Sequence, residues 1–207
     1  MTDQKRRIGI YGGTFAPPHI AHVRAAAAFL RAAELDELLV MPDSIPPHKQ
    51  IDPGDDPRVR LAMTRAAFAG IDSRITVSDY EIQRAGVSYT SDTLAHFAGQ
   101  GRLYFLCGTD MFLSLDTWRA PEKIFALAVI VCAMRENDRA AYEAICRKQE
   151  EFRSRYGAET MLLSLAPMEL SSTAIRERVR RGESIDGMVA PAVARIIEEN
   201  NLYRNQV

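Results

Sequence analysis

Two histidines, His19 and His22, follow a short apolar segment and two glycines in the sequence IGIYGGTFAPPHIAHVRAAAAFL. A spacing of three residues places both imidazoles on one face of a helix. Each imidazole can donate a hydrogen bond to a phosphate oxygen, and protonation would add positive charge beside a polyanion. Gly12 and Gly13 allow a sharp turn close to a ligand, and Thr14 offers a hydroxyl and an amide. The pattern favours phosphate binding; a metal site and two structural histidines are the alternatives.

Two expected helix N-termini add further groups that bind anions. The first helix should begin near residues 18–19, where unpaired N–H groups and the helix dipole favour an anion. The second follows in LSSTAIRERVRRG, where Ser171, Ser172 and Thr173 can cap a helix and supply hydroxyls. Arg176 lies one turn further and can present a bidentate fork to a phosphate. A capped helix with solvated arginines is the alternative for this segment.

A further cation, Lys49, lies in the proline-rich polar stretch DSIPPHKQIDPGDDP, residues 43–57. We expect this stretch to be a long loop, and loops of this kind often carry function. A lysine there could reach a phosphate as a point charge. A surface lysine is the alternative, and the role of His48 stays open.

The elements that must position these residues begin with six short apolar runs, at 8–11, 38–41, 75–78, 103–107, 129–133 and 161–165. The runs are continuous rather than alternating in polarity, which is typical of strands buried on both faces of a parallel sheet. Helical stretches are expected at 20–33, 57–69, 91–98, 137–154, 171–181 and 190–203. The alternation predicts an α/β fold: a doubly wound, Rossmann-like parallel sheet flanked by helices. We expect a single domain over residues 1–207, with a helical C-terminal part from about residue 171.

Ligands of an open parallel sheet bind beyond the carboxyl ends of its strands. The segments to search are therefore 12–22, 42–49, 78–90, 108–118 and 166–176. Every candidate site residue named in this section lies in one of these segments. We therefore expect these residues to gather at one edge of the sheet.

Composition narrows the class of protein. The 207 residues are 47% hydrophobic and 26% charged, which is ordinary for a globular protein. A net charge of −1 argues against a general nucleic-acid binder but allows a local basic patch. Cys107 and Cys132 lie in apolar runs without a CxxC pair, so we expect reduced, buried thiols. The MTDQKRR start lacks an apolar signal segment, and no apolar run reaches the ~20 residues that span a bilayer, so we expect a cytoplasmic protein.

The segment GGTFAPPHIAH resembles the GGTFxPxHxGH signature of the nucleotidylyltransferase superfamily, which includes the class I aminoacyl-tRNA synthetases. It differs from that signature at Ala21, where glycine is usual, and at Ala16, where Asp or Asn is common. The resemblance implies that His19 and His22 contact the phosphates of a nucleoside triphosphate and stabilise charge in the transition state. LSSTAIR is similar to the family's (I/L)SSTxIR motif, which holds the triphosphate from the other side. The family also carries a lysine in the loop that contains Lys49. The ATP- and phosphate-binding residues implied in this way are Gly12, Gly13, Thr14, Phe15, Gly108, Asp110, Ser171, Ser172 and Thr173.

Three further segments resemble the bacterial nicotinate-nucleotide adenylyltransferases. They are SYTSDTL at 88–94, GTDMFLSLDTW at 108–118, and the terminal PxxVxxxIxxxxLY pattern. The resemblance implies that Trp118 stacks on the nicotinate ring, that Tyr89 and Thr90 recognise its carboxylate, and that Asp110 contacts the nucleotide. An indole offers a broad π-face to a pyridine ring. A core tryptophan is the alternative for Trp118.

The activity implied by the resemblance is adenylyl transfer in NAD biosynthesis. The 5′-phosphate of nicotinate mononucleotide would attack the α-phosphorus of ATP, releasing pyrophosphate and forming nicotinate adenine dinucleotide. A phosphate monoester is mostly dianionic near pH 7, so no general base is needed. The catalytic donors would be His19, His22, Lys49 and Arg176, with Mg²⁺ bridging the triphosphate.

Two alternatives to this activity remain. The first is another phosphate acceptor, such as nicotinamide mononucleotide or phosphopantetheine. The second is a nucleotide-binding regulator without turnover. The expected partners are ATP and nicotinate mononucleotide, without nucleic acid or membrane, and a homo-oligomer is possible.

Overall fold

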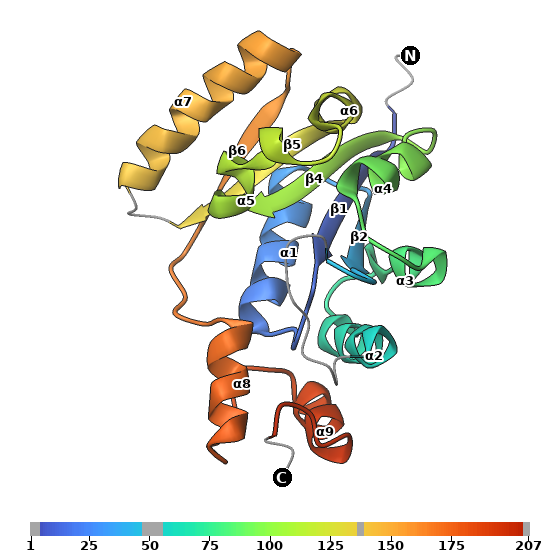
Figure 1. The fold of residues 1–207 in the computed structure, drawn as a ribbon, viewed down its shortest axis with the longest axis vertical. Helices are drawn as coiled ribbons and strands as arrows, with labels where there is room; N and C mark the ends of the chain where they lie inside the picture. Colours follow the sequence, from blue (N-terminus) through green and yellow to red (C-terminus); the bar gives the residue numbers. More distant parts are fainter. Residues whose placement is uncertain (1–4, 47–55, 136–138, 205–207) are drawn as a thin grey trace.

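The computed structural model describes residues 5–46, 56–135 and 139–204. Within these ranges, six strands form one parallel sheet in the order β3-β2-β1-β4-β5-β6 (Figure 1). The strands are β1 (Arg7–Gly13), β2 (Glu37–Pro42), β3 (Ile75–Val77), β4 (Arg102–Gly108), β5 (Ala128–Arg135) and β6 (Thr160–Leu165). The strand order reverses between β1 and β4, so the crevice that binds ligands in doubly wound sheets is expected there. The predicted Rossmann-like sheet is confirmed.

The apolar strands are continuous because the sheet has a hydrophobic core on each face. In β4, the side chains of Leu103, Phe105 and Cys107 join the first core. The intervening side chains of Tyr104 and Leu106 join the second. Successive residues of a strand point to opposite faces, so burial on both sides requires an unbroken apolar run. The expected burial of the cysteine thiols in β4 and β5 is confirmed as well.

Helices cover the two faces in separate groups. The first core contains residues of α4 (Thr90–Phe97), α5 (Thr109–Leu113), η1 (Leu115–Thr117), α6 (Pro121–Leu127) and α7 (Arg139–Tyr156). The second contains residues of α1 (Ile20–Ala32), α2 (Pro57–Phe68), α8 (Ser172–Arg180) and α9 (Pro191–Glu199). The remaining helix, α3 (Tyr80–Arg84), lies between β3 and α4 in the chain.

The six predicted helices are present, but the short helices α3, α5, η1 and α6 were not predicted. They have between three and seven residues, fewer than two turns. Such a length is too short to display the 3.6-residue apolar period that marks a helix in a sequence. Three of the four, α5, η1 and α6, follow one another between β4 and β5, where they shape the segment after the switch point.

The C-terminal helices are attached to the beginning of α1, as Figure 1 shows. The N–H of Ile20, the first residue of α1, donates to the carbonyl oxygen of Met188 at 3.0 Å. Ile175 of α8 and Val193 of α9 are fully buried in the second core. These contacts bring the serine-rich segment that precedes α8 next to the loop that follows β1.

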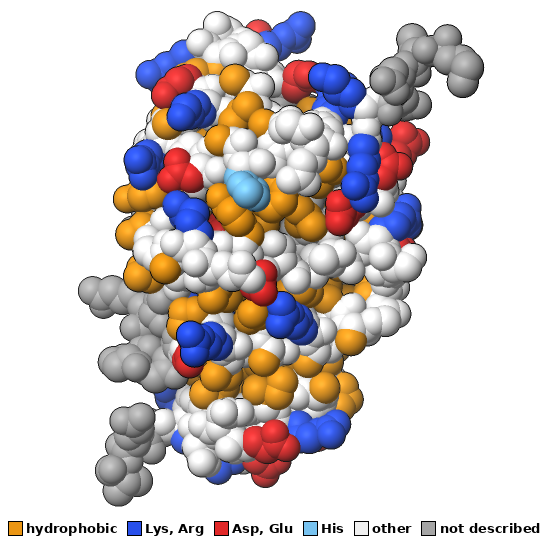
Figure 2. All heavy atoms as spheres, turned by 90° about the vertical axis from the view of Figure 1, so that its right-hand side faces the viewer, with side chains coloured by type: hydrophobic (Ala, Val, Ile, Leu, Met, Phe, Trp, Pro, Cys, Tyr) orange, Lys and Arg blue, Asp and Glu red, His pale blue; other side chains and the backbone are white. Residues whose placement is uncertain are grey.

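The face shown in Figure 2 carries Lys and Arg side chains interspersed with Asp and Glu, with apolar side chains between them. This mixture agrees with a net charge of −1. Among the described residues, no helix is both long and apolar enough to cross a bilayer.

Candidate active site

A cleft of about 1930 Å³ lies at the carboxyl ends of the strands. It is lined by the segments that follow β1, β2, β4 and β6, by the end of β5 and by the start of α4. Every sequence-predicted site residue that the structure describes lines this cleft: Gly12, Gly13, Thr14, Phe15, His19, His22, Tyr89, Thr90, Gly108, Asp110, Trp118, Ser171, Ser172, Thr173 and Arg176. Lys49 and His48 lie outside the described residues. The topology thus brings together segments up to about 160 residues apart, as the argument from strand ends predicts.

The two histidines share one face, as their spacing predicts. Their rings are stacked, with centroids 3.6 Å apart and an interplanar angle of 21°. The backbone N–H of His19 donates to Nδ1 of His22 at 3.2 Å. That bond makes Nδ1 of His22 an acceptor, so in the neutral ring the proton lies on Nε2. His22 can therefore donate from Nε2 to a ligand in the cleft.

His19 differs from the expectation of an easily protonated imidazole. The residue is 6% exposed, and burial lowers its pKa from 6.5 to about 4. Its Nδ1 has no hydrogen-bond partner among the described residues. Desolvation penalises the charged form, so His19 is neutral near pH 7 in this structure. In the free protein its side chain is therefore a neutral polar group and not a fixed cation.

The N-terminus of α1 offers fewer N–H groups than the sequence predicts. The N–H of Ile20 is taken by Met188, and that of His19 by His22. The N–H of Ala21 donates to no acceptor among the described residues, and Ala21 lines the cleft. Of these three N–H groups, only that of Ala21 could bind an anion at the start of this helix.

The loop after β1 and the start of α8 are joined directly. Oγ of Ser172 donates to the carbonyl oxygen of Pro17 at 2.9 Å. Nη1 of Arg176 donates to the carbonyl oxygen of Ala16 at 2.8 Å, and Nη2 to Oγ1 of Thr173 at 3.3 Å. The sequence predicts that this guanidinium binds phosphate. In the structure it also bonds the loop after β1, residues 14–19 (the histidine loop), to α8.

The first turn of α8 keeps donors available to a ligand. Ser171 caps the helix by accepting from the N–H of Ala174 at 3.1 Å. The N–H groups of Ser172 and Thr173 donate to no acceptor within the part of the chain described. Both residues line the cleft beside the loop that follows β1. Unpaired N–H groups at a helix N-terminus attract anions such as phosphate.

On the other side of the switch point, α4 begins at the cleft. Tyr89 is its N-cap residue, and the N–H groups of Thr90 and Ser91 have no acceptor among the described residues. The guanidinium of Arg119 lies 4.3 Å from the ring centroid of Tyr89 and 3.6 Å from a carboxylate oxygen of Asp92. Sequence reasoning missed Arg119, although it directly follows Trp118. Its cation adds to the positive potential at this helix start.

Trp118 lies between the first core and the cleft. Its ring packs edge-on against Phe105 at 6.4 Å and contacts the first core. It remains partly exposed and lines the cleft. Packing against the core fixes the position of the indole at the edge of the cleft.

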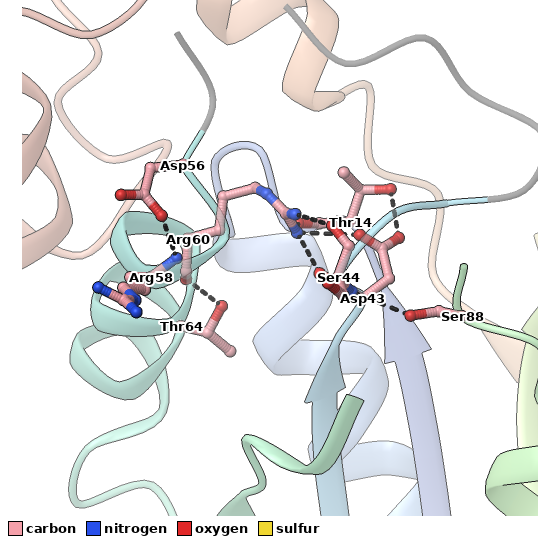
Figure 3. Close-up of polar contacts among 8 residues, drawn as sticks. All are labelled: Thr14, Asp43, Ser44, Asp56, Arg58, Arg60, Thr64 and Ser88. Atoms are coloured by element: carbon pink, nitrogen blue, oxygen red, sulfur yellow. Dashed lines mark hydrogen bonds and ion pairs between the residues drawn. The ribbon is translucent and has the colours of Figure 1, made fainter. Parts of the chain in front are cut away.

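Beneath the cleft lies a buried polar network that the sequence did not suggest (Figure 3). Arg60 of α2 is 0% exposed and forms an ion pair with Asp43 at 2.9 Å. Asp43 also accepts a hydrogen bond from Oγ1 of Thr14 at 2.9 Å. The signal in the sequence is an arginine on the same helical face as Met63 and Ala67, where an apolar residue is expected.

A second buried carboxylate, Glu81, also lines the cleft. It accepts from Oγ1 of Thr93 at 2.6 Å, and burial raises its pKa. Among the described residues, no group of three or more His, Cys, Asp or Glu side chains could hold a metal ion.

The fold and the cleft are typical of a nucleotide-binding protein. Helix N-termini, two stacked histidines and an arginine surround one cleft at the end of a Rossmann-like sheet. Comparison with known proteins agrees. A family model described as cytidylyltransferase-like matches residues 10–178. The chain therefore belongs to the cytidylyltransferase-like family of nucleotidyltransferases. Its full-length relatives place it among the nicotinate-nucleotide adenylyltransferases of that family.

Two curated relatives illustrate this similarity. A probable nicotinate-nucleotide adenylyltransferase of Chromobacterium violaceum is 38% identical over 210 residues, which cover 96% of this chain and 99% of that protein. One of Clostridium beijerinckii is 37% identical over 206 residues, covering 96% and 100%. Among solved structures, the Plasmodium falciparum nicotinic acid mononucleotide adenylyltransferase complexed with APC has a TM-score of 0.70 at 18% identity, covering 96% of this chain and 97% of that one. The last likeness supports the fold, and the resemblance inferred from the motifs is confirmed.

Proposed function

We propose that this protein transfers the adenylyl group of ATP to nicotinate mononucleotide, releasing pyrophosphate and forming nicotinate adenine dinucleotide. One observation carries the proposal: the loop with His19 and His22 and the start of α8 with Arg176 are bonded to each other and face one cleft. The family and the full-length relatives support the same activity.

The triphosphate is proposed to lie between the histidine loop and α8. The available N–H groups of Ala21, Ser172 and Thr173 would bind its oxygens, and Nε2 of His22 would donate to the group that carries the growing negative charge. Arg176 contributes its charge while holding the loop in place. We propose that Mg²⁺ arrives with ATP, where it neutralises charge on the phosphates. Lys49, outside the described residues, is retained as a further donor.

The acceptor is proposed to lie on the α4 side. The nicotinate ring would stack on Trp118, and its carboxylate would take the N–H groups of Thr90 and Ser91 beside the cation of Arg119. The 5′-phosphate of nicotinate mononucleotide is mostly dianionic near pH 7 and can attack the α-phosphorus of ATP directly. The protein's contribution is then to align two anions and offset their charge.

The test is pyrophosphate release by the purified protein with ATP and Mg²⁺, offered nicotinate mononucleotide, nicotinamide mononucleotide or phosphopantetheine separately. We expect the highest kcat/KM with nicotinate mononucleotide. A higher kcat/KM with another acceptor would refute the proposed substrate. ATP binding without release for any acceptor would refute the proposed activity and favour a regulator.

Single-residue variants test the proposed roles. His22→Ala should lower kcat about 10²–10³-fold, the loss typical of one donor to transition-state charge. The matched control is His96→Ala, because His96 is an exposed histidine stacked on Tyr80 and not part of the cleft lining. Equal turnover of the two variants would refute the role of His22. Trp118→Ala should raise KM for the acceptor about 10-fold with Trp118→Phe largely restoring it, since stacking on an aromatic ring contributes about 1–3 kcal/mol.

A further inference from the structure

The buried guanidinium of Arg60 contacts four oxygen atoms at the ends of β1 and β2 (Figure 3). Nη1 lies 2.9 Å from the carbonyl oxygen of Thr14, from the carbonyl oxygen of Asp43 and from Oδ1 of Asp43. Nη2 lies 3.0 Å from the carbonyl oxygen of Ser44. A fully buried cation is tolerated only where such bonds satisfy it. All four acceptors belong to the two loops that leave the sheet beside the cleft.

These bonds fix the peptide that joins Thr14 to Phe15. The carbonyl oxygen of Thr14 points to Arg60, and its Oγ1 donates to Oδ2 of Asp43 at 2.9 Å. In a planar trans peptide, the N–H lies opposite the carbonyl oxygen. The N–H of Phe15 therefore points away from Arg60, and it has no acceptor among the described residues. Phe15 lines the cleft, whereas Arg60 does not.

The conformation of Phe15 needs such support. Its φ is +50°, in the left-handed region that residues other than glycine rarely adopt. Its ring is buried against Tyr11, Phe68 and His22. A strained residue persists where its surroundings fix it from several sides, and such residues concentrate at functional sites.

The same network reaches the acceptor side of the cleft. The N–H of Ser44 donates to Oγ of Ser88 at 3.0 Å, and the N–H of Ser88 donates to the carbonyl oxygen of Ile45 at 2.9 Å. Ser88 directly precedes Tyr89, the N-cap residue of α4. The guanidinium is thus connected through Ser44 to the start of the helix proposed to bind the nicotinate carboxylate.

We infer that Arg60 is a positioning residue for adenylyl transfer: it aims the N–H of Phe15 at the triphosphate and fixes the loop after β1 relative to the start of α4. The inference rests on the proposed function. Arg60 touches neither substrate and acts through Thr14 and Ser44. A lysine would keep the charge beside Asp43 but lacks the planar fork that spans both loops.

The test compares Arg60→Lys, Arg60→Met and Asp43→Asn with the control Arg58→Met. Arg58 lies on the same helix, and its exposed side chain forms no ion pair or hydrogen bond with a described residue. For each variant, the folded fraction is determined by circular dichroism, and kcat and KM are expressed per folded molecule. Arg60→Lys should lower kcat about 10–100-fold with KM for ATP changed less than about threefold, since a displacement near 1 Å can cost about 10²-fold in rate.

A second readout does not depend on turnover. The amide resonance of Phe15 should move when ATP is added to the wild-type protein and to Arg58→Met, and this movement should fall by at least half in Arg60→Lys. The inference would be overturned if Arg60→Lys had the same kcat per folded molecule as Arg58→Met. It would also be overturned if the Phe15 amide of Arg60→Lys responded to ATP as in the wild type. A wild-type protein whose Phe15 amide responds to ATP but which adenylylates no acceptor would instead refute the proposed function. If Arg60→Met does not fold, the role of Arg60 is tested by Arg60→Lys and Asp43→Asn alone.

Discussion

Replacing His19 with glutamine should remove a large part of the pH dependence of stability. Burial lowers the pKa of His19 from 6.5 to about 4. One pKa unit corresponds to about 1.4 kcal/mol, so the lowering corresponds to about 3 kcal/mol. The native state resists protonation that the unfolded chain accepts below pH 6.5. The contribution of neutral His19 to the free energy of unfolding is therefore fully present above pH 6.5. It is lost as the pH falls from 6.5 to about 4.

The assay is urea unfolding followed by circular dichroism between pH 4 and pH 7.5. The free energy of unfolding of the wild type minus that of His19→Gln should decrease by about 3 kcal/mol from pH 7 to pH 4. Groups that both proteins share, such as the buried Glu81, cancel in this difference. The control His96→Gln removes an exposed imidazole that does not line the cleft.

A nuclear magnetic resonance titration of the His19 ring measures the pKa directly. We expect a value well below 6.5 in the free protein and a rise on addition of ATP, because a nearby phosphate stabilises the imidazolium. A free-protein value near 6.5, or a stability difference that stays constant from pH 7 to pH 4, would refute the conclusion that burial holds this imidazole neutral.

Three further predictions concern stability and are measured by thermal or urea unfolding. Gly9→Ala should destabilise by about 1–3 kcal/mol, because a Cβ there would clash with Cδ1 of Leu35 in the core behind β1; unchanged unfolding would contradict this packing. Phe152→Ala should cost about 3–5 kcal/mol, since the ring is 0% exposed and its loss leaves a cavity under α7; a cost below about 1 kcal/mol would show that the site collapses. Ser172→Ala should cost about 0.5–1.5 kcal/mol by leaving the carbonyl of Pro17 without its 2.9 Å bond, whereas Ser171→Gly, at the N-cap, should cost only a few tenths.

The sheet and the location of the site could be predicted because their signals are local in the sequence. Continuous apolar runs reflect burial on both faces, and in a parallel sheet the segments after the strands must meet at one edge. The features of residues 12–22 and 171–176 that predict phosphate binding are also local, because helix N-termini and glycine turns depend on neighbouring residues. The family resemblance followed from these motifs and is confirmed. The individual roles of the site residues remain predictions.

Tertiary structure decided the properties that depend on contacts between distant segments. The pKa of His19 follows from how deeply the folded chain buries it, which its sequence neighbours do not reveal. Met188 takes an N–H of α1 that local reasoning had left for a ligand. The sequence shows Arg60 on the apolar face of its helix, but only folding shows that it bonds to Thr14 and Asp43. A sequence pattern reports which groups a segment carries, but desolvation and hydrogen-bond pairing are set by the groups that the fold brings next to it.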